Sequence, residues 1–422
     1  MTQPGKDLPL KPYRILDLTQ GGCLICGKLL ADLGADVVQI EDPKGNPSRS
    51  MGPFYKDIPH SEKSLFWFAY SVNKRGVTLD IETADGADVF RQLVKKADFV
   101  LESFEPGYLD SLGLGYDDLS QINPRVIMTS ITPYGQTGPK AHYKGSDLTG
   151  WASGGAMHTM GDPDRAPNWI SFGPQASLHG GVEGAAASLI AHWHRELTGE
   201  GQQVDVSIQQ CTVWLLQAAI QIYEVNRVSY SRVGALWMTG GGVGRRQVYP
   251  CKDGFIAFTV FGGGLPGLVA STRRLVDWMA ADGMAPEWLQ NYKWETDFDV
   301  AKVTQEEVNR VEVPFVEFFL TKTKAELWEQ AWKQSIILAP ASDAKDMYTD
   351  QQLAARDYWR KLDHPELGES LTYCGPFIKF SETPISFRRR APLIGEHNTE
   401  VYQGELGLSK ERLILLKQAG VI

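Results

Sequence analysis

The sequence predicts an α/β protein whose first half forms a doubly wound parallel sheet. Two observations lead to this fold class. Apolar segments of strand length alternate with helical patterns through the first half of the chain, and each strand, helix, strand unit occupies about 30 residues, the size of a βαβ unit. A long helical stretch then leads into a glycine-rich turn, after which shorter strands and amphipathic helices resume. A separate, smaller unit is therefore expected in the second half.

The first βαβ unit opens the chain. Residues 13–19 have the composition of a short buried strand, and two glycines follow it. Leucines between Leu24 and Leu33 recur with helical spacing, which predicts a helix that ends at Gly34. Residues 36–41 then predict a second strand. Such a unit implies parallel strands with a helix crossing over one face of the sheet.

The alternation continues as far as Val206. Further strands are expected at residues 76–80, 99–102 and 126–131, with a helix over 86–96. Repeated βαβ units place helices on both faces of a parallel sheet. The first part of the chain is therefore expected to be a doubly wound body.

The second half has a different pattern. A helical stretch after Val206 leads into a glycine-rich turn at 239–245. Residues 247–340 alternate short strands with amphipathic helices, and the tail from residue 350 returns to strands before a closing helix at 410–418.

Composition excludes several classes of protein. The chain has 422 residues, of which 43% are hydrophobic and 22% charged, as in ordinary globular proteins. A formal net charge of -9 and a pI near 5.5 argue against nucleic acid and against anionic membrane surfaces. The sequence contains no long apolar run and opens without a secretory pattern, so a cytoplasmic location is expected. Five scattered cysteines are an odd number and do not suggest a disulfide framework.

Two motifs share the first strand-to-helix turn. Gly22–Lys28 fits the first seven positions of a phosphate-binding P-loop, but the eighth is Leu29, where a P-loop needs a hydroxyl to hold Mg²⁺. Nucleotide hydrolysis is therefore not predicted. Cys23 and Cys26 have the spacing of a redox pair at a helix start, and small thiols facing the core are the alternative.

Three weaker features complete the survey. Gly240–Arg246 could cover a phosphate or a carboxylate intermediate, or could be an interdomain turn. Arg388–Arg390 could be an anion patch or a solvated cluster. His192 and His194 lie two residues apart on a predicted helix and point to different faces, so no metal site is predicted.

Ten ordered blocks, together with the run from Ser171 to Val206, resemble the class III CoA-transferases over nearly the whole chain. The blocks are Ile15–Thr19, Leu30–Val37 with Glu41, Asn73–Arg75 with Leu79–Asp80, Glu102–Phe104 with Pro106–Gly107, Gly113–Tyr116, Asn123–Val126, Tyr134–Pro139, Ser153–Gly155, Thr198–Gln202 and Pro392–His397. The resemblance implies a Rossmann-like large domain made from both chain ends, an inserted small α+β domain and an interlinked dimer. The implied parts are residues 1–206 (large domain), 207–238 (helical linker), 239–340 (small domain) and 341–422 (return segment completing the large domain).

Ser177 departs from the family pattern. In the family this stretch reads Asp-x-x-(Gly/Ala)-Gly before a helix of small residues, and here Ser177 occupies the position of the aspartate. The resemblance implies that the aspartate is the nucleophile, which forms a mixed anhydride and then an enzyme thioester. A serine would form an ester, which lies well below a thioester in energy, and it would need a base, for which His179 is the nearby candidate. We expect Ser177 to be inactive in transfer.

Other departures fall where the family holds CoA. Asp42, Glu105 and Ser111 stand where arginines are common in active members, and such arginines help to hold the phosphates of CoA. Ser146 stands where the racemase branch of the family has a histidine, and Asp147 remains beside it as a possible auxiliary carboxylate. The residues left for a weak, vestigial CoA site are Lys74, Arg75, Phe104 and Lys144.

The resemblance therefore implies the non-catalytic subunit of a heteromeric CoA-transferase, paired with a paralogous catalytic subunit that bears the aspartate. A CoA thioester is a substrate of the complex, and no tightly bound cofactor is expected. The member that this pattern resembles most moves CoA from succinyl-CoA to (R)-benzylsuccinate in anaerobic toluene degradation. The alternatives are a self-sufficient CoA-transferase for another carboxylic acid, with Asp147 or a locally shifted alignment supplying the nucleophile, and a structural homologue that does not use CoA.

Overall fold

The chain divides into two compact units. The computed structural model describes residues 8–170, 172–239, 242–264, 266–299 and 301–422. The first unit comprises the residues up to Met157, Trp169–Ser229 and Gln352–Ile422. The second comprises His158–Asn168 and Tyr230–Gln351. Each unit has its own hydrophobic core.

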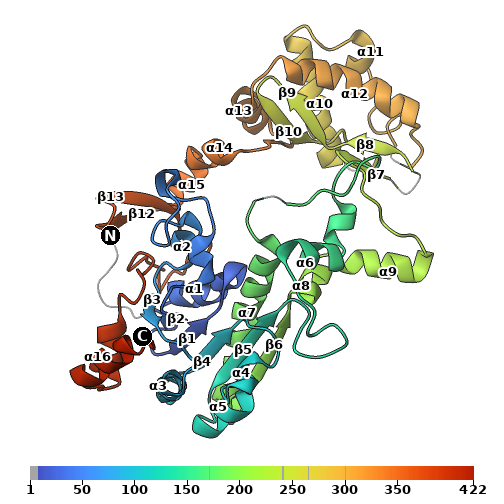
Figure 1. Cartoon of the computed structure of the whole chain (residues 1–422). Helices are drawn as coiled ribbons and strands as arrows, with labels where there is room; N and C mark the ends of the chain where they lie inside the picture. The colour runs from blue at the N-terminus through green and yellow to red at the C-terminus, as the bar shows by residue number, and fades with distance from the viewer. Residues whose placement is uncertain (1–7, 171, 240–241, 265, 300) are drawn as a thin grey trace. The chain divides into compact units, whose positions relative to one another are not determined.

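A six-stranded sheet forms the centre of the first unit (Figure 1). Its strands are β1 (Arg14–Leu18), β2 (Asp36–Glu41), β3 (Arg75–Thr78), β4 (Phe99–Glu102), β5 (Ile127–Thr132) and β6 (Gln203–Ser207). The strand order is β3-β2-β1-β4-β5-β6, and every neighbouring pair is parallel. This is the doubly wound order of Rossmann-like folds, and the direction of winding reverses between β1 and β4. The predicted fold class is confirmed.

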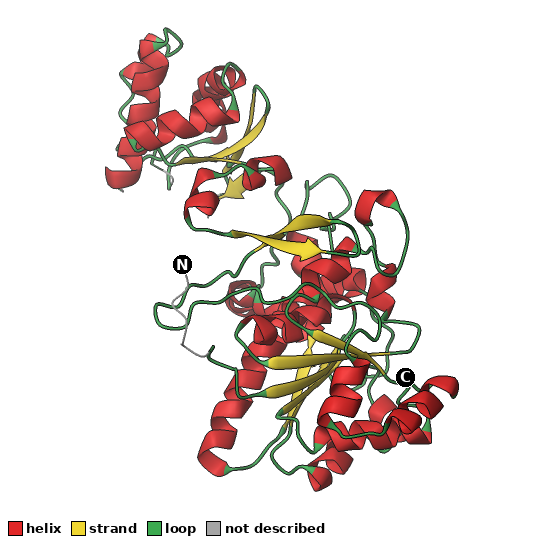
Figure 2. Ribbon diagram, turned by 90° about the vertical axis from the view of Figure 1, so that its left-hand side faces the viewer, coloured by secondary structure: helices red, strands yellow, loops and turns green. Residues whose placement is uncertain are grey.

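Side chains alternate between two cores on opposite faces of the sheet, so helices cover both faces (Figure 2). Leu16 and Val38 face one core, with α3 (Ala84–Val94), α5 (Tyr116–Ile122) and α16 (Lys410–Gln418). Ile15 and Val37 face the other. That second core contains α1 (Leu24–Asp32) and α7 (Gln175–Thr198). Strands buried on both faces explain the nearly continuous apolar runs of the sequence.

Helix α7 packs closely on its neighbours because its buried face is made of small residues. A Cβ added at Gly181 would lie 2.5 Å from the Ile25 side chain, and one at Gly184 would lie 2.8 Å from Ile131. Glycine is therefore required where α7 meets α1 and β5. The close approach fixes the first turn of α7 beside the carboxyl end of β1.

The remaining elements of the first unit border the sheet. The short helical turns are Gly21–Cys23, Pro47–Ser50, Tyr55–Asp57 and Ala156–Thr159. The helices are α2 (Leu65–Tyr70), α4 (Tyr108–Ser111), α6 (Asp147–Ser153), α8 (Ile208–Trp214), α9 (Gln217–Asn226) and α15 (Gln351–Ala355). An antiparallel hairpin of β12 (Trp359–His364) and β13 (Glu369–Cys374) and the π-helix Thr399–Glu405 complete the set. The predicted helical linker 207–238 is helical only as far as Asn226, because α9 ends at Arg227 in the left-handed conformation (φ 57°). No helix in the described ranges is long and apolar enough to cross a membrane.

The second unit is a small α+β body. An antiparallel sheet of β9 (Val248–Cys251), β10 (Gly254–Phe258) and β11 (Leu338–Pro340) accompanies the hairpin β7 (Leu236–Met238) and β8 (Gly244–Arg246). Its helices are α10 (Pro266–Ala281), α11 (Glu287–Gln290), α12 (Gln305–Leu320), α13 (Lys324–Gln334) and α14 (Ala344–Tyr348). The compact unit extends beyond residues 239–340 at both ends. In the predicted glycine loop, residues 240 and 241 lie outside the described residues, and β8 follows them.

Candidate active site

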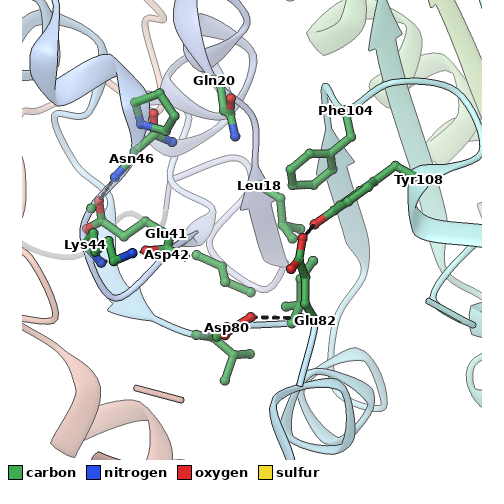
Figure 3. Close-up of a pocket in the computed structure, with 15 residues that line it drawn as sticks. Leu18, Gln20, Glu41, Asp42, Lys44, Asn46, Asp80, Glu82, Phe104 and Tyr108 are labelled. Atoms are coloured by element: carbon green, nitrogen blue, oxygen red, sulfur yellow. Dashed lines mark hydrogen bonds between the residues drawn. The ribbon is translucent and has the colours of Figure 1, made fainter. Parts of the chain in front are cut away.

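Two of the cavities in the described part of the chain concern us here, and both open at the carboxyl edge of the sheet, where open α/β sheets bind their ligands. The first, which we call the Ser177 cavity, has a volume of about 380 Å³. The second, which we call the acidic cavity, has a volume of about 620 Å³ and is drawn in Figure 3. Gln20 and Pro47 line both cavities, so the two are neighbours around the point where the winding reverses.

Ser177 lies in the first turn of α7 and lines the Ser177 cavity. Its backbone N–H donates to Oδ1 of Asp147 at 3.0 Å, and its hydroxyl lies 3.5 Å from the same oxygen. Asp147 does not line either cavity, so it lies behind Ser177. Its Oδ2 atom is buried and has no hydrogen-bond partner among the described residues. Asp147, which the sequence analysis gave as a possible auxiliary carboxylate, is therefore the residue that positions Ser177.

The local structure explains why these residues meet. Ser146 caps α6 and forms a capping box with Thr149, which sets Asp147 as the first residue of that helix. Gly22, beside the end of β1, permits α7 to approach, because a Cβ there would lie 2.7 Å from Cβ of Ser177. Ser146, where the sequence comparison expected a histidine in the racemase branch, is the N-cap of α6 in the structure.

Among the described residues, the hydrogen bond from the Ser177 hydroxyl to a possible general base, Asp147, is a long one. The 3.5 Å between its hydroxyl and Asp147 exceeds the roughly 2.6–3.2 Å at which a base abstracts a proton. His179 packs edge-on against Trp151 with ring centroids 6.2 Å apart. Among the described residues no hydrogen bond joins His179 to Ser177, because side chains two residues apart on a helix point in different directions.

Carboxylates dominate the acidic cavity. Asp42, Asp80 and Glu82 line it together with one cation, Lys44. The phenol of Tyr108 donates to Glu82 at 2.7 Å, as Figure 3 shows. Burial, followed by the charges of Glu82, Asp80 and Asp42, raises the pKa of Tyr108 to about 12. The cavity is therefore a region of negative potential.

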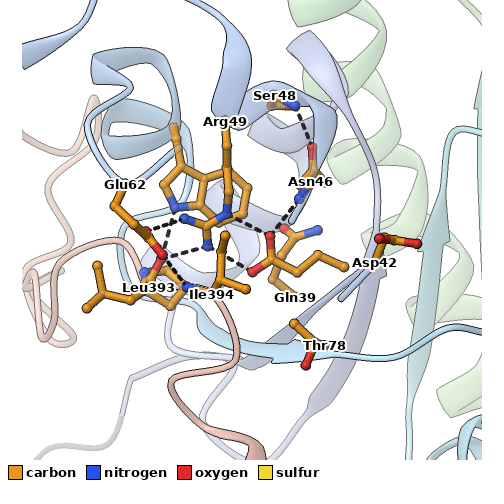
Figure 4. A network of polar contacts seen from close by, with 12 residues as sticks. Gln39, Asp42, Asn46, Ser48, Arg49, Glu62, Thr78, Leu393 and Ile394 are labelled. Carbon is orange, nitrogen blue, oxygen red and sulfur yellow. Dashed lines mark hydrogen bonds and ion pairs between the residues drawn. The ribbon is translucent and has the colours of Figure 1, made fainter. Parts of the chain in front are cut away.

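A buried ion pair supports the rim of this cavity (Figure 4). Arg49 donates to both oxygens of Glu41 at 2.7 and 2.8 Å and to Glu62 at 2.7 Å. Its guanidinium also lies 3.9 Å from the centre of the Trp67 ring. This network fixes the segment after β2, which carries Asp42 and Lys44.

The four residues predicted for CoA do not come together. Phe104 lines the acidic cavity. Lys74 is fully buried and donates to Asp17, Gln39 and the carbonyl of Leu24. Arg75 opens β3 at the opposite edge of the sheet, where it pairs with Asp36, Glu400 and Glu405. Lys144 is exposed in the loop before α6.

In the structure, the residues of the two motifs in 22–28 are buried in the fold or paired within it. Cys23 and Cys26 are buried free thiols, and burial raises the pKa of Cys23 to about 12. Lys28 of the P-loop-like run pairs with Asp32 of the same helix. Of the other sequence departures, Asp42 faces the acidic cavity, whereas the Ser111 hydroxyl donates to the carbonyl of Tyr108.

Glu102 is a titratable residue near this edge that sequence reasoning did not single out. It ends β4, is 4% exposed, and accepts a hydrogen bond from the backbone N–H of Phe104 at 2.7 Å. Burial, with a smaller contribution from the charges of Asp110 and Asp205, raises its pKa to about 7. The sequence could have indicated Glu102 as a site residue, because it stands at the end of an apolar strand.

Fold and sequence together define the class of protein. The chain matches the profile of CoA-transferase family III over residues 10–398, and it belongs to that family. It is 36% identical over 400 residues to the succinyl-CoA:(R)-benzylsuccinate CoA-transferase subunit BbsE of Thauera aromatica, a match that covers 92% of each chain. A formyl-CoA:oxalate CoA-transferase of Streptomyces coelicolor is 31% identical, with 98% of this chain and 99% of that protein covered.

Other relatives extend the comparison. The succinyl-CoA--L-malate CoA-transferase beta subunit of Chloroflexus aurantiacus is 31% identical, with 98% of both chains covered. Among solved structures, a CAIB/BAIF family protein from Brucella suis superposes with a TM-score of 0.80 at 25% identity, covering 94% of this chain and all of that one. The resemblance predicted from the sequence is confirmed.

Proposed function

We propose that this chain is the subunit of a heteromeric CoA-transferase that does not carry the nucleophile, and that a paralogous subunit supplies the catalytic aspartate. The observation that carries this proposal is Ser177, a neutral hydroxyl where the resemblance places the family carboxylate, with one long hydrogen bond of 3.5 Å to Asp147. Reversible transfer needs a carboxylate, because an anhydride and a thioester are close enough in energy to exchange. A serine ester would trap the acyl group.

An exposed apolar stripe on α7 supports the proposal that this chain has a partner subunit. Ile190, Trp193 and Leu197 follow one another on α7 at helical spacing and are 71%, 67% and 70% exposed. Apolar side chains gathered on a helix face are typical of protein interfaces. We assign this surface to the paralogous subunit.

We further propose succinyl-CoA as donor and (R)-benzylsuccinate as acceptor. The support is the 36% identity to a subunit of the enzyme that bears those names. Relatives named for oxalate and L-malate are 31% identical and compete as models for the acceptor. The acceptor must therefore be tested directly.

The half-site of this chain is proposed to bind CoA weakly. Lys74 and Arg75 have their donors engaged by carboxylates and neighbouring carbonyl groups, so we assign them structural roles. Phe104 remains as a cavity wall and Lys144 as an exposed cation. The carboxylates of the acidic cavity would repel CoA phosphates.

A self-sufficient enzyme is the second candidate, and the unpartnered Oδ2 of Asp147 favours it. Against it, Asp147 does not line the Ser177 cavity and uses Oδ1 to hold the Ser177 N–H. Assays of the chain alone and with its paralogue separate the two. Using succinyl-CoA with (R)-benzylsuccinate, oxalate or L-malate, we expect transfer to (R)-benzylsuccinate only when both subunits are present. Transfer by this chain alone, abolished by Asp147→Asn, would establish the second candidate instead.

A further inference from the structure

We propose that Arg245, in the second unit, binds a carboxylate group that comes from outside this chain. Arg245 is the middle residue of β8 and is 8% exposed. The proposal does not depend on which subunit carries the nucleophile, so it and the proposed function can fail separately.

The guanidinium of Arg245 is buried without an ion pair. Among the described residues its one hydrogen bond runs from Nη1 to the carbonyl oxygen of Val260 at 3.3 Å, and its Nε atom is buried with no partner. Burial lowers the pKa of Arg245, and the charge of Glu312 offsets this in part. Arginine is rarely buried in a protein unless an anion pairs with it.

The other buried arginines of the described residues each have a carboxylate partner. The ion pairs are Arg49 with Glu41 at 2.7 Å, Arg75 with Asp36 at 2.7 Å and Arg195 with Asp98 at 3.2 Å. For Arg245 the described part of the chain supplies no such pair. Because an uncompensated buried charge destabilises a fold, we expect its partner to come from another molecule.

The charge around Arg245 fits a carboxylate better than a phosphate. Arg246 follows it in β8, and the Arg246 Nε atom lies 4.0 Å from Oε2 of Glu312. Glu312 is 8% exposed and accepts the backbone N–H of Arg246 at 2.7 Å. Two guanidinium groups therefore stand against one carboxylate. A second carboxylate would neutralise the excess charge, and its two oxygens match the N–H fork of arginine. A phosphate monoester would bring about two negative charges beside Glu312.

Urea denaturation of the full-length chain alone tests whether the charge is unpaired. Arg245→Met removes the charge and keeps a long side chain, so the urea midpoint should stay the same or rise. Arg49→Met leaves Glu41 buried without its partner and should lower the midpoint clearly. A drop in Arg245→Met as large as that in Arg49→Met would overturn the proposal, because the chain itself would then supply the partner.

Thermal melting of the chain at constant ionic strength tests for a small acid. Butyrate carries one carboxylate, butyramide is its neutral counterpart, and inorganic phosphate is a second oxyanion. We expect butyrate alone to raise the melting temperature, by at least about 2 °C at saturation, and Arg245→Met to abolish the shift. Arg273→Met, on α10 of the same unit, removes an exposed arginine that pairs with Glu295 and should keep the shift. An equal shift with phosphate would overturn the assignment to a carboxylate.

A second arm identifies a carboxylate side chain of the partner subunit as the source. In that case butyrate has no effect, and Arg245→Met lowers the amount of complex with the paralogous subunit by at least about tenfold in native mass spectrometry, whereas Arg273→Met does not. Either source agrees with the proposal. Absence of a butyrate shift together with normal assembly of Arg245→Met would overturn it. If the wild type does not bind the paralogue, the proposed function fails and the melting experiment alone decides.

Discussion

Asp147 holds the backbone N–H of Ser177 at 3.0 Å through Oδ1, so this carboxylate orients the first turn of α7. The Ser177 hydroxyl is only a distant second contact at 3.5 Å. This arrangement keeps α7 in place whether or not residue 177 performs chemistry.

The first prediction concerns Ser177→Ala. Because the backbone contact to Asp147 survives the substitution, the variant should fold normally, and the two-subunit enzyme should keep its transfer rate within about twofold. Replacing the partner's nucleophile should lower the rate by at least about 10⁴. Steady-state rates with succinyl-CoA as donor check both. A loss in Ser177→Ala as large as that in the partner variant would show that Ser177 takes part in the chemistry.

The second prediction concerns Gly22→Ala. The new Cβ would lie 2.7 Å from Cβ of Ser177 and 2.9 Å from the carbonyl oxygen of Pro174. Such overpacking against a helix start should lower the free energy of unfolding by about 1–3 kcal/mol in urea denaturation. Gly404→Ala is the control, because the nearest atom lies 4.0 Å away. Equal stability of the two variants would contradict the close contact between α7 and the first turn.

The third prediction is a pH dependence from Glu102. Its pKa is raised from 4.5 to about 7, so the folded state holds the proton more tightly than the unfolded chain. Its contribution to stability is therefore present below pH 4.5 and is lost as the pH rises through 7. Relative to Glu102→Gln, the wild type should lose up to about 3 kcal/mol of unfolding free energy between pH 4.5 and 8.

Urea denaturation across this pH range checks the Glu102 prediction. Ser120→Ala on α5, which removes no titratable group, serves as the control and should give a difference from wild type that does not vary with pH. A constant difference for Glu102→Gln as well would show that Glu102 titrates normally.

The fourth prediction tests the partner surface. Trp193→Lys places a charge in the apolar stripe of α7, where the side chain is 67% exposed and so contributes little to the fold of the subunit. Native mass spectrometry should show a loss of the complex with the paralogue by at least about tenfold, while circular dichroism stays unchanged. Gln121→Lys, which adds the same charge at an exposed position of α5, should assemble normally. Normal assembly of both variants would place the interface elsewhere.

Much of the fold was predictable because most strands of the parallel sheet are buried on both faces, whereas the edge strand β6 is partly exposed. The winding order was not predictable from local pattern, since it depends on which buried faces pair across the sheet. The helical linker was predicted too long because the apolar pattern up to Ile222 does not show where the helix stops, and Arg227 adopts a left-handed conformation that ends α9.

The candidate site was only partly predictable. Ser177 and Asp42 were found because each departs from a family pattern, and both line cavities at the carboxyl edge. Lys74 and Arg75 lie in a recognisable block, but their interior ion pairs depend on residues far away in the sequence. The raised pKa of Glu102 likewise comes from burial, which the sequence does not show.

The site of the covalent CoA adduct tests the central claim most directly. The two-subunit enzyme is incubated with succinyl-CoA, trapped with borohydride or hydroxylamine, digested and mapped by mass spectrometry. The modified residue should be the aspartate of the paralogous subunit, with no modification of the peptides that contain Asp147 and Ser177. An adduct on either of those residues would contradict the assignment of this chain as the subunit without the nucleophile.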